Sequence, residues 1–504
     1  MAGRRPSVTA LVIGVCAFIA AAIAAFQLTR PGQLPGTSYD TSVYFGAAIR
    51  LVHGAIAYRD FAFVQPPGLV ILLSPFGLLS EVVGTRRALD ALLLCTPLVA
   101  ALNVILVGRL VRHRGWRAAL VACGLMAVYP ALFFALLDGM VEPLMDLCCL
   151  VGLCLVFQGD ALAGRRRLAL GGAALGVAGT IMVSAVIPAL VVAVLCARHP
   201  RRCLMPLAGG LVAGFAIPSL PFAVLSPGGF FDGVVVSQLG RVPRADRTPG
   251  ALRLLDLTFG GGQTWAVVAA GIIALVIIAG LVVPPHRRLS ALEGFALGAT
   301  LAMLAVQFVT SQYFPHYPAM VAPFLAIQLG ISAGRLGSWR LPRFVPSAAT
   351  ALAVWLLAAQ VMNVEAVTSV RVPGGFVAGV VPAGACALAN RTYLLIASDR
   401  FISSVAGCSE MVDTTGVRYA DVDRPGAAVA AFQSAITHAG YVVVDMSLAE
   451  WFFGSAYAPL RAYVGDHFHL VREHRLYFYV RDGFPVGTSS AGTGGAPSVV
   501  DQPS

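Results

Sequence analysis

The stretch that decides the fold class is residues 8–28, which read VTALVIGVCAFIAAAIAAFQL and follow Arg4 and Arg5. This stretch has no charged residue and is long enough for a helix to cross about 30 Å of hydrocarbon. A cleaved signal peptide would share the basic start, but no polar region with small residues follows as a cleavage site. We therefore expect the first span of a membrane protein here.

The composition extends this expectation to the whole chain. Of 504 residues, 58% are hydrophobic and 12% are charged, and the mean hydropathy is +0.80. A soluble domain carries about 25% charged residues. The basic residues are scattered among apolar segments rather than clustered with aromatics, so they do not indicate a nucleic-acid partner. All 35 are arginine, which we interpret as the codon usage of a GC-rich bacterial genome.

Further apolar windows predict about eleven spans in total. Residues 168–197 are too long for one upright helix and predict two short helices that meet at a break near Ser184 and Pro188. The other windows are 88–108, 118–136, 143–157, 204–225, 265–283, 291–310, 318–331 and 346–364.

The arginines predict the orientation of these spans. The runs that would face the cytoplasm are in segments 4–5, 109–117, 165–167, 198–202, 287–288 and 335–343, whereas the short loops 138–142 and 312–317, assigned to the other side, contain no arginine. Arginine-rich loops face the cytoplasm, so the N-terminus is expected inside and the C-terminus outside. A full span at 67–84 would reverse every later loop, and we therefore interpret that segment as interfacial.

The domain organisation follows from this topology. We predict an all-α polytopic membrane domain over residues 1–364, with long outer loops at 29–87 and 226–263. A small extracytoplasmic α/β domain is expected at 365–484, with strands at 393–397, 441–444 and 476–480 and a helix at 425–438. Residues 485–504, rich in Ser, Gly and Pro, are expected to be disordered.

Eight of the ten cysteines fall in or beside predicted spans. The other two, Cys386 and Cys408, lie in the expected outer domain without a metal-type spacing or a third partner. An oxidising compartment favours a disulfide between them, with two free buried thiols as the alternative.

The first outer loop places acids close to the expected membrane surface. A carboxylate such as Asp40, soon after the first span, can have a raised pKa near apolar surface and act as a general base. The alternative is a helix N-cap, because residues 44–52 have helical spacing. Asp60 and Gln65 follow in the same loop.

A second acidic cluster enters the membrane from the outer side. Asp138, Glu142 and Asp146 are spaced i, i+4, i+8 and share one helix face. Ionisable groups in spans usually face a cavity or a partner. The alternative roles are structural. Asp138 would cap the helix and Glu142 would pair with an arginine. For Asp146 we favour a structural role.

Two more polar clusters are expected outside. His316, in an aromatic loop, can bind a phosphate or a metal or orient a carboxylate, although an interfacial aromatic belt explains its tyrosine neighbours equally well. The arginines of the second long loop suit a phosphate head group or anionic lipid; this cluster comprises Gln238, Arg241, Arg244, Arg247 and Arg253.

All four clusters are expected on one side of the membrane, although they come from distant parts of the sequence. Together they describe a site at the outer surface for a substrate with an anionic phosphate head and a lipid tail.

In this order, the motifs resemble those of the GT-C superfamily of membrane glycosyltransferases. The resemblance covers the whole chain and is nearest to bacterial polyprenyl-phosphate-mannose transferases, including protein-mannosyltransferase-like and arabinofuranosyltransferase-like branches. It is carried by Asp40 in the first loop, Tyr58-Arg59-Asp60-Phe61, Gln65-Pro66-Pro67-Gly68, Arg86-Arg87, Glu142-Pro143 and His316-Tyr317.

The resemblance implies an inverting transfer of mannose, or another hexose or pentose, from a polyprenyl-phosphate donor to an acceptor hydroxyl outside the bacterial cytoplasmic membrane. The acceptor is a lipid, a glycan or a protein. Asp40 would be the general base. The residues expected at the substrate or donor are Asp60, Gln65, Glu142, Arg241 and His316.

One departure from the resemblance concerns the phosphate. Relatives often carry a basic residue near the break between the paired short helices, where this chain has Thr180-Ile181-Met182. Neutralisation of the phosphate would then fall to the outer arginines. No cofactor and no metal cluster are predicted, and the resemblance leaves a divalent metal open.

Two other function classes compete with a transferase. A lipid or glycan transporter would use Glu142 and Asp146 as a path, but the polar groups lie at one surface rather than the midplane and no inverted repeat is present. A scaffold of envelope assembly would leave the acidic first loop without a role.

Overall fold

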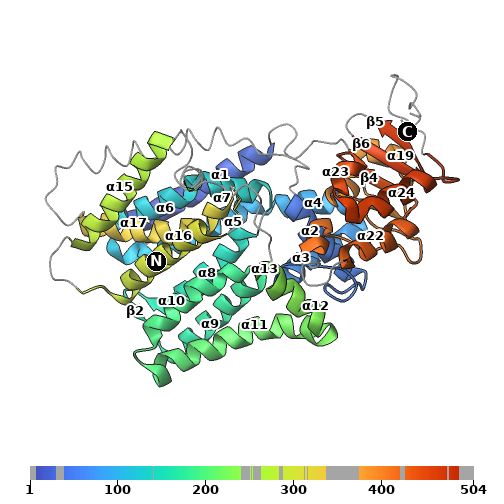
Figure 1. Ribbon diagram of the computed structural model, residues 1–504. Helices are drawn as coiled ribbons and strands as arrows, with labels where there is room; N and C mark the ends of the chain where they lie inside the picture. Colours follow the sequence, from blue (N-terminus) through green and yellow to red (C-terminus); the bar gives the residue numbers. More distant parts are fainter. Residues whose placement is uncertain are drawn as a thin grey trace. The chain divides into compact units, whose positions relative to one another are not determined.

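The computed structural model describes residues 7–29, 39–139, 141–239, 250, 253, 263–282, 288–310, 313–314, 316–336, 374–419, 426–473 and 476–486. The chain divides into two compact units (Figure 1). The helical unit comprises residues 1–33, 93–219 and 242–366, and the mixed unit comprises residues 34–92, 220–241 and 367–504. The span expected at 346–364 and the tail expected to be disordered lie outside the described residues.

The helical unit consists of apolar helices that pack side by side. Helix α1 packs on α5 and α6, α8 packs on α9, and α17 packs on α6, α15 and α16. The helices are α1 (Val8–Thr29), α5 (Thr96–Val111), α6 (Trp116–Val128), α7 (Pro130–Leu137), α8 (Glu142–Val156), α9 (Arg165–Ile181), α10 (Val186–Cys196), α11 (Met205–Leu225), α15 (Gln263–Val282), α16 (Ala291–Val309) and α17 (Ala322–Leu336).

Helices α9 and α11 approach each other through paired glycines. A Cβ atom at Gly172 or Gly176 would collide with backbone carbonyls of α11, and one at Gly210 or Gly214 would collide with carbonyls of α9. Each pair is spaced i, i+4, which is the small-residue pattern that allows membrane helices to pack backbone to backbone. A side chain at any of these four positions would force the two helices apart.

Among the described residues, four helices are long and apolar enough to cross a membrane, and α6 with α7, bent by 45°, could form a fifth. The four are Val8–Thr29, Thr85–Arg114, Pro200–Leu225 and Ala291–Val309. The break predicted near Ser184 is confirmed, because α9 ends at Ile181 and a 3₁₀ turn at Val183–Ala185 precedes α10. The count of eleven spans stays a prediction.

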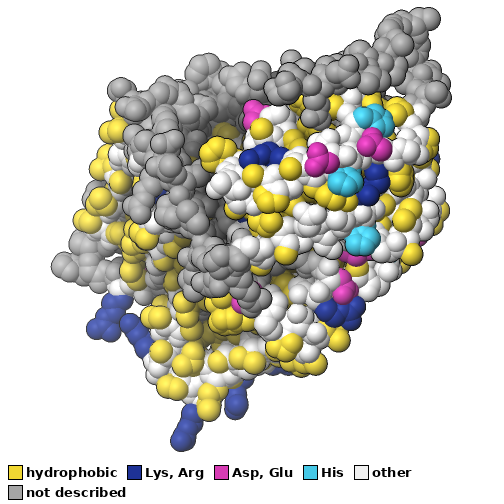
Figure 2. Space-filling model, turned by 45° about the vertical axis from the view of Figure 1, so that its right-hand side comes forward, with side chains coloured by type: hydrophobic (Ala, Val, Ile, Leu, Met, Phe, Trp, Pro, Cys, Tyr) yellow, Lys and Arg dark blue, Asp and Glu magenta, His cyan; other side chains and the backbone are white. Residues whose placement is uncertain are grey.

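Large hydrophobic side chains are exposed along these helices, as a lipid environment requires. Val194, Ile217 and Val267 are examples on α10, α11 and α15. In Figure 2 hydrophobic side chains cover much of the lower surface, and arginines project from its lower edge.

The mixed unit combines the first long loop with the C-terminal segment. The first loop forms α2 (Tyr39–Val52), α3 (Gly68–Val83) and α4 (Thr85–Leu93), and residues 227–239 add α12 (Pro227–Phe231), η4 (Asp232–Val236) and α13 (Ser237–Leu239). The C-terminal helices are α19 (Gly374–Val380), α20 (Tyr393–Ile396), α21 (Thr414–Tyr419), α22 (Ala427–His438), α23 (Leu448–Trp451) and α24 (Ala458–His467).

A four-stranded sheet of order β3-β4-β6-β5 forms the centre of the C-terminal segment. The strands are β3 (Ala387–Ala389), β4 (Tyr441–Val444), β5 (Phe468–Glu473) and β6 (Leu476–Arg481). Only the β3–β4 pair is parallel. Buried Phe432, Trp451 and Phe452 pack together against this sheet as an aromatic core.

The structure corrects one strand prediction in this segment. The strands expected at 441–444 and 476–480 and the helix expected at 425–438 are confirmed. Residues 393–397 are not a strand, because Tyr393–Ile396 forms the short buried helix α20. Periodicity cannot separate a strand from a buried helical turn in so short an apolar run. A disulfide joins Cys386 and Cys408, whose Cα atoms are 5.5 Å apart.

Candidate active site

The proposed base lies at the start of a helix in the mixed unit. Asp40 is in the first turn of α2, and its side chain is neither buried nor fully exposed. An acid in the first turn interacts favourably with the helix dipole. Asp40 follows the first helical residue, Tyr39, so it lies inside the helix rather than at the N-cap position weighed in the sequence analysis.

The motif Tyr58-Arg59-Asp60-Phe61 forms a tight turn in the same unit. Tyr58 has a φ of 69°, and its backbone N–H donates to the carbonyl of Phe61 at 2.9 Å. Asp60 accepts hydrogen bonds from the backbone N–H of Ile56 at 2.7 Å and from Nε and Nη2 of Arg59, at 2.9 and 2.7 Å. The Arg59 hydrogen bonds, followed by that of Ile56, outweigh slight desolvation and hold the pKa of Asp60 below its usual range.

The ring of Tyr58 anchors this turn, and Gln65 lies at its edge. The Tyr58 hydroxyl donates to the backbone carbonyl of Gln65 at 2.5 Å, and the ring meets Phe63, Phe222 and Phe230 edge-on. Gln65 itself is 9% exposed. The first loop is therefore an ordered structure built around a buried tyrosine.

A second candidate group, in the helical unit, is a buried acid beside a histidine. Glu142, in the first turn of α8, is 1% exposed, and its Oε1 lies 3.5 Å from Nε2 of His316. The His316 ring is stacked against Phe134 and Phe314, with interplanar angles of 6° and 13°. Burial lowers the pKa of His316 to about 4, so the imidazole is neutral at pH 7.

The structure therefore brings together two of the predicted residues, Glu142 and His316, which are 174 positions apart in sequence. The other two acids of that helical cluster, Asp138 and Asp146, are buried as well. Asp138 is the C-cap of α7, not the N-cap of the following helix. Asp146 lies one turn beyond Glu142 on α8.

The second long loop is described only in part. Arg241, Arg244 and Arg247 lie outside the described residues. Arg253 is 5% exposed, donates to the carbonyl of Gln307 at 2.7 Å and lies 5.0 Å from the ring centre of Tyr313. Arg253 therefore stabilises the packing of the helical unit through these two contacts.

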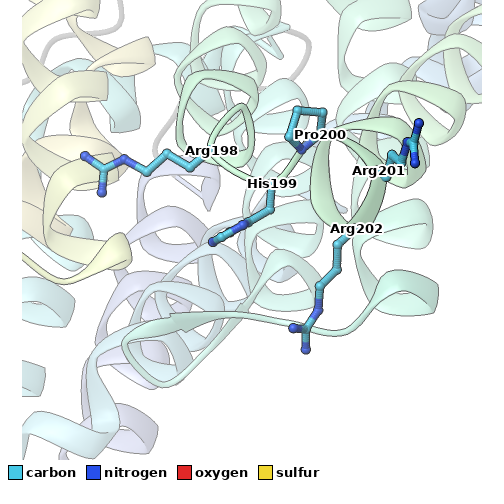
Figure 3. A pocket seen from close by; sticks show the side chains of 5 residues that line it. All are labelled: Arg198, His199, Pro200, Arg201 and Arg202. Carbon is cyan, nitrogen blue, oxygen red and sulfur yellow. The ribbon is translucent and has the colours of Figure 1, made fainter.

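An open pocket of about 400 Å³ lies at the turn between α10 and α11 and is lined by Arg198, His199, Pro200, Arg201 and Arg202. Its side chains point in different directions rather than toward one centre (Figure 3). It belongs to an arginine-rich segment expected on the cytoplasmic side. Diverging, solvated arginines at that level fit the positive-inside pattern, and we assign the pocket no chemistry.

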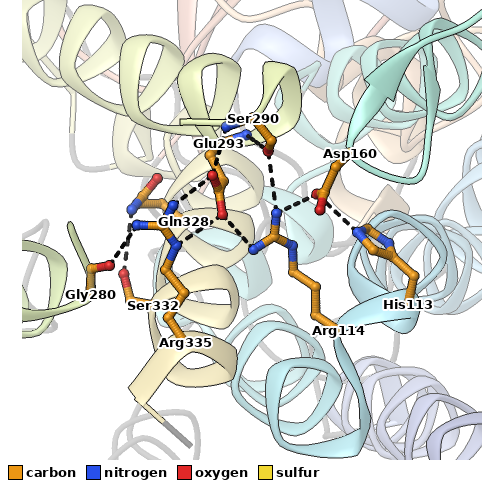
Figure 4. Close-up of polar contacts among 9 residues, drawn as sticks. All are labelled: His113, Arg114, Asp160, Gly280, Ser290, Glu293, Gln328, Ser332 and Arg335. Atoms are coloured by element: carbon orange, nitrogen blue, oxygen red, sulfur yellow. Dashed lines mark hydrogen bonds and ion pairs between the residues drawn. The ribbon is translucent and has the colours of Figure 1, made fainter. Parts of the chain in front are cut away.

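The sequence analysis missed a buried ion-pair network in the helical unit (Figure 4). Glu293 of α16 accepts from Arg114 at 2.7 Å and from Arg335 at 2.9 and 2.6 Å. Asp160, in the hairpin after α8, accepts from Arg114 and pairs with His113 at 3.0 Å. Burial raises the pKa of Asp160, but these hydrogen bonds outweigh burial and keep it below its usual range.

The local sequence held one signal for this network. Ser290 and Glu293 form a capping box at the start of α16, a pattern readable from S-x-x-E. The two arginines, by contrast, belonged to runs that were interpreted as topology signals. No group of three His, Cys, Asp or Glu side chains within the described ranges could hold a metal ion.

The chain is similar to known glycosyltransferases in sequence and in fold. Residues 63–307 match the model of glycosyltransferase family 87, and ArnT from Cupriavidus metallidurans, in a crystal structure bound to undecaprenyl phosphate, has a similar fold. Both findings agree with the predicted resemblance to the GT-C superfamily. That ArnT structure has a TM-score of 0.61 and 15% identity, covering 94% of this chain and 97% of ArnT.

Two further solved structures are similar to the chain, with lower TM-scores. ArnT in the apo state gives a TM-score of 0.56 at 15% identity, over 91% of this chain and 97% of that one. The oligosaccharyltransferase of Archaeoglobus fulgidus gives only 0.46 at 13% identity, over 93% and 73%. No curated protein sequence matches the chain. The mannosyl and arabinofuranosyl branches named in the sequence analysis therefore stay predictions.

Proposed function

We propose that this protein is a GT-C glycosyltransferase that transfers a sugar from a polyprenyl-phosphate donor to an acceptor hydroxyl at the outer face of a bacterial cytoplasmic membrane. The observation that carries the proposal is the family match over residues 63–307 on a fold similar to that of ArnT. The ligand bound in that ArnT structure, undecaprenyl phosphate, supports a lipid-phosphate donor. The sugar is a hexose, mannose among them, or a pentose, and the acceptor is a lipid, glycan or protein.

In the proposed reaction the Asp40 carboxylate takes the proton of the acceptor hydroxyl. The acceptor oxygen attacks the anomeric carbon from the face opposite the phosphate, and the bond from that carbon to the phosphate oxygen breaks. The polyprenyl phosphate leaves with the bonding electron pair, so the configuration inverts. Asp40 suits this role because it is a partly exposed carboxylate beside a helix start, and a positioned base contributes roughly 10²–10⁴-fold to a rate.

The other predicted residues have supporting roles in this proposal. Glu142 and His316 form a buried pair that would hydrogen-bond the donor, and Gln65 and Arg241 would lie near its phosphate. Asp60 would hold the first loop through Arg59 and Ile56, and thereby orient the substrate. A membrane domain of about eleven spans, with an inner N-terminus and an outer C-terminal α/β domain, would place these groups at the outer surface.

The experiment is complementation of a deletion strain, read by mass spectrometry of envelope glycans and glycolipids. We expect a glycan lacking one sugar to accumulate in the deletion strain, and its missing mass names the sugar. Wild type should restore the profile and Asp40→Asn should not. Asp466→Asn is the matched control: it makes the same change at an exposed carboxylate of α24 that has no role in the proposed site, and it should restore the product.

The outcomes separate the candidate functions. Full restoration by Asp40→Asn at a normal expression level would reject Asp40 as the base. An unchanged envelope on deletion, in a strain without a second homologue, would reject the transferase and favour the transporter.

A further inference from the structure

Helix α2, which carries Asp40, lies beside the C-terminal segment of the mixed unit and contacts its helix α20 (Figure 1). The Tyr39 hydroxyl donates to Oδ1 of Asp413 at 2.8 Å and accepts the backbone N–H of Thr415 at 2.8 Å. Burial, followed by the charge of Asp413, raises the pKa of Tyr39, so the hydroxyl keeps its proton at pH 7. This contact joins residues 374 positions apart.

Two further contacts continue along the same helix. At Gly46 a Cβ atom would lie 2.9 Å from Cγ1 of Val412, so α2 and the C-terminal segment touch closely there. At the other end, Nη1 of Arg50 lies 2.7 Å from Oε2 of Glu410, and the guanidinium lies 4.3 Å from the ring centre of Phe401. The C-terminal segment therefore contacts α2 near its start, its middle and its end.

The helical repeat places these three contacts on one line. At about 100° per residue, positions 46 and 50 lie within roughly 20° of the direction of Tyr39. Asp40 is the next residue after Tyr39 and is turned by about 100° from that line. Asp40 therefore lies on the face of α2 next to the one that contacts the C-terminal segment. Of the three contacts, that of Tyr39 is nearest to Asp40 in the sequence, and it sets the position of Asp40.

Capping of α21 by Asp413 does not by itself explain why Tyr39 also binds this carboxylate. Oδ1 of Asp413 accepts the backbone N–H of Gly416 at 2.7 Å and so caps α21, a role that Asn or Ser fills equally well. The cap needs no tyrosine from a helix near the other end of the chain. The hydroxyl of Tyr39 is an additional donor, directed to that same oxygen.

We propose that Tyr39, held by Asp413, is a positioning residue that fixes the carboxylate of Asp40 for sugar transfer. The inference rests on the proposed function, because it requires Asp40 to be the base. It gives the C-terminal segment a part in the reaction without any contact to substrate.

The test compares variants that weaken the Tyr39–Asp413 contact at the start of α2 with a variant that weakens the Arg50–Glu410 contact near its end. Purified full-length protein is added to membranes of the deletion strain, which supply donor and acceptor, and the initial rate of product formation is measured by mass spectrometry at several pH values. We expect Tyr39→Phe and Asp413→Ala to lower the rate about tenfold, and Asp413→Asn, which keeps an acceptor oxygen, to remain within about threefold of wild type. Glu410→Gln is the control, because it weakens the Arg50 end of the same helix.

The positioning role predicts that Glu410→Gln lowers the apparent melting temperature as much as Tyr39→Phe does while leaving the rate within about twofold. Equal rate losses for both variants, or a wild-type rate for Tyr39→Phe, would overturn the inference. The Asp40→Asn variant distinguishes a failure of the positioning role of Tyr39 from a failure of the proposed base. If Asp40→Asn is inactive and Tyr39→Phe fully active, only the inference fails; if Asp40→Asn is active, the proposed base fails first.

Discussion

Replacing Glu293 with glutamine should destabilise the helical unit far more than a single surface charge would. One oxygen of Glu293 accepts from Arg114 and Arg335, and the other accepts from Arg335 and the backbone N–H of Ser290. The side chain is 2% exposed. Removing one partner of a buried ion pair costs about 3–5 kcal/mol, because the remaining charges stay buried and unmatched.

The measurement is thermal unfolding of the purified protein in detergent, followed by intrinsic tryptophan fluorescence. At about 2 °C per kcal/mol for a domain of this size, the expected fall in the apparent Tm is roughly 6–10 °C. Because membrane proteins often unfold irreversibly, wild type and variant are heated at the same scan rate.

The chain contains a matched control for this substitution. Glu450 completes a capping box with Ser447, as Glu293 does with Ser290, but it is exposed and has no arginine among its described contacts. Glutamine also serves in a capping box, so Glu450→Gln should shift the apparent Tm by less than about 2 °C. Equal shifts for the two variants would refute the claim that the arginine pairs, and not the cap, stabilise this region.

Two other outcomes are expected. Replacing both Cys386 and Cys408 with alanine should remove about 3 kcal/mol in the chain-entropy model, because the bridge closes a loop with a separation of 22 residues; non-reducing peptide mass spectrometry that finds two free thiols in wild type would contradict this. Stability should also fall in acid: the pKa of His316 is lowered by burial to about 4, so below about pH 6.5 only the unfolded chain takes up this proton. The loss between pH 6.5 and 4 should be smaller in His316→Gln, and identical pH profiles would show that His316 does not contribute.

The local properties of the chain were predictable, and the long-range partners were not. The break near Ser184 followed from the length of the apolar run, and the strand at Tyr441–Val444 followed from its β-branched residues. The run at 393–397 was ambiguous for the same physical reason, since a short apolar segment fits either a strand or a buried helical turn. Local pattern thus determined most elements but not the ambiguous short ones.

In the candidate site too, the chemistry of single residues could be predicted from the sequence, and their long-range contacts could not. The sequence singled out Asp40, Glu142 and His316 by their chemistry and by an expected common side of the membrane. It could not indicate that Tyr39 contacts Asp413 or that Arg114 and Arg335 share Glu293, because no periodicity links such distant positions. Arginine in particular was ambiguous, since the same residue serves as a topology signal in one loop and as a buried partner in another.

The contact between Tyr39 and Asp413 also bears on how the chain is synthesised. The two residues are 374 positions apart, and translation at about 5–20 residues per second separates their emergence by roughly 20–75 s. During that interval α2 has been made but the surface that covers Gly46 and Arg50 has not. Segments exposed in this way are prone to aggregation or proteolysis, so biogenesis of this protein should depend on chaperones that shield the first loop until translation ends.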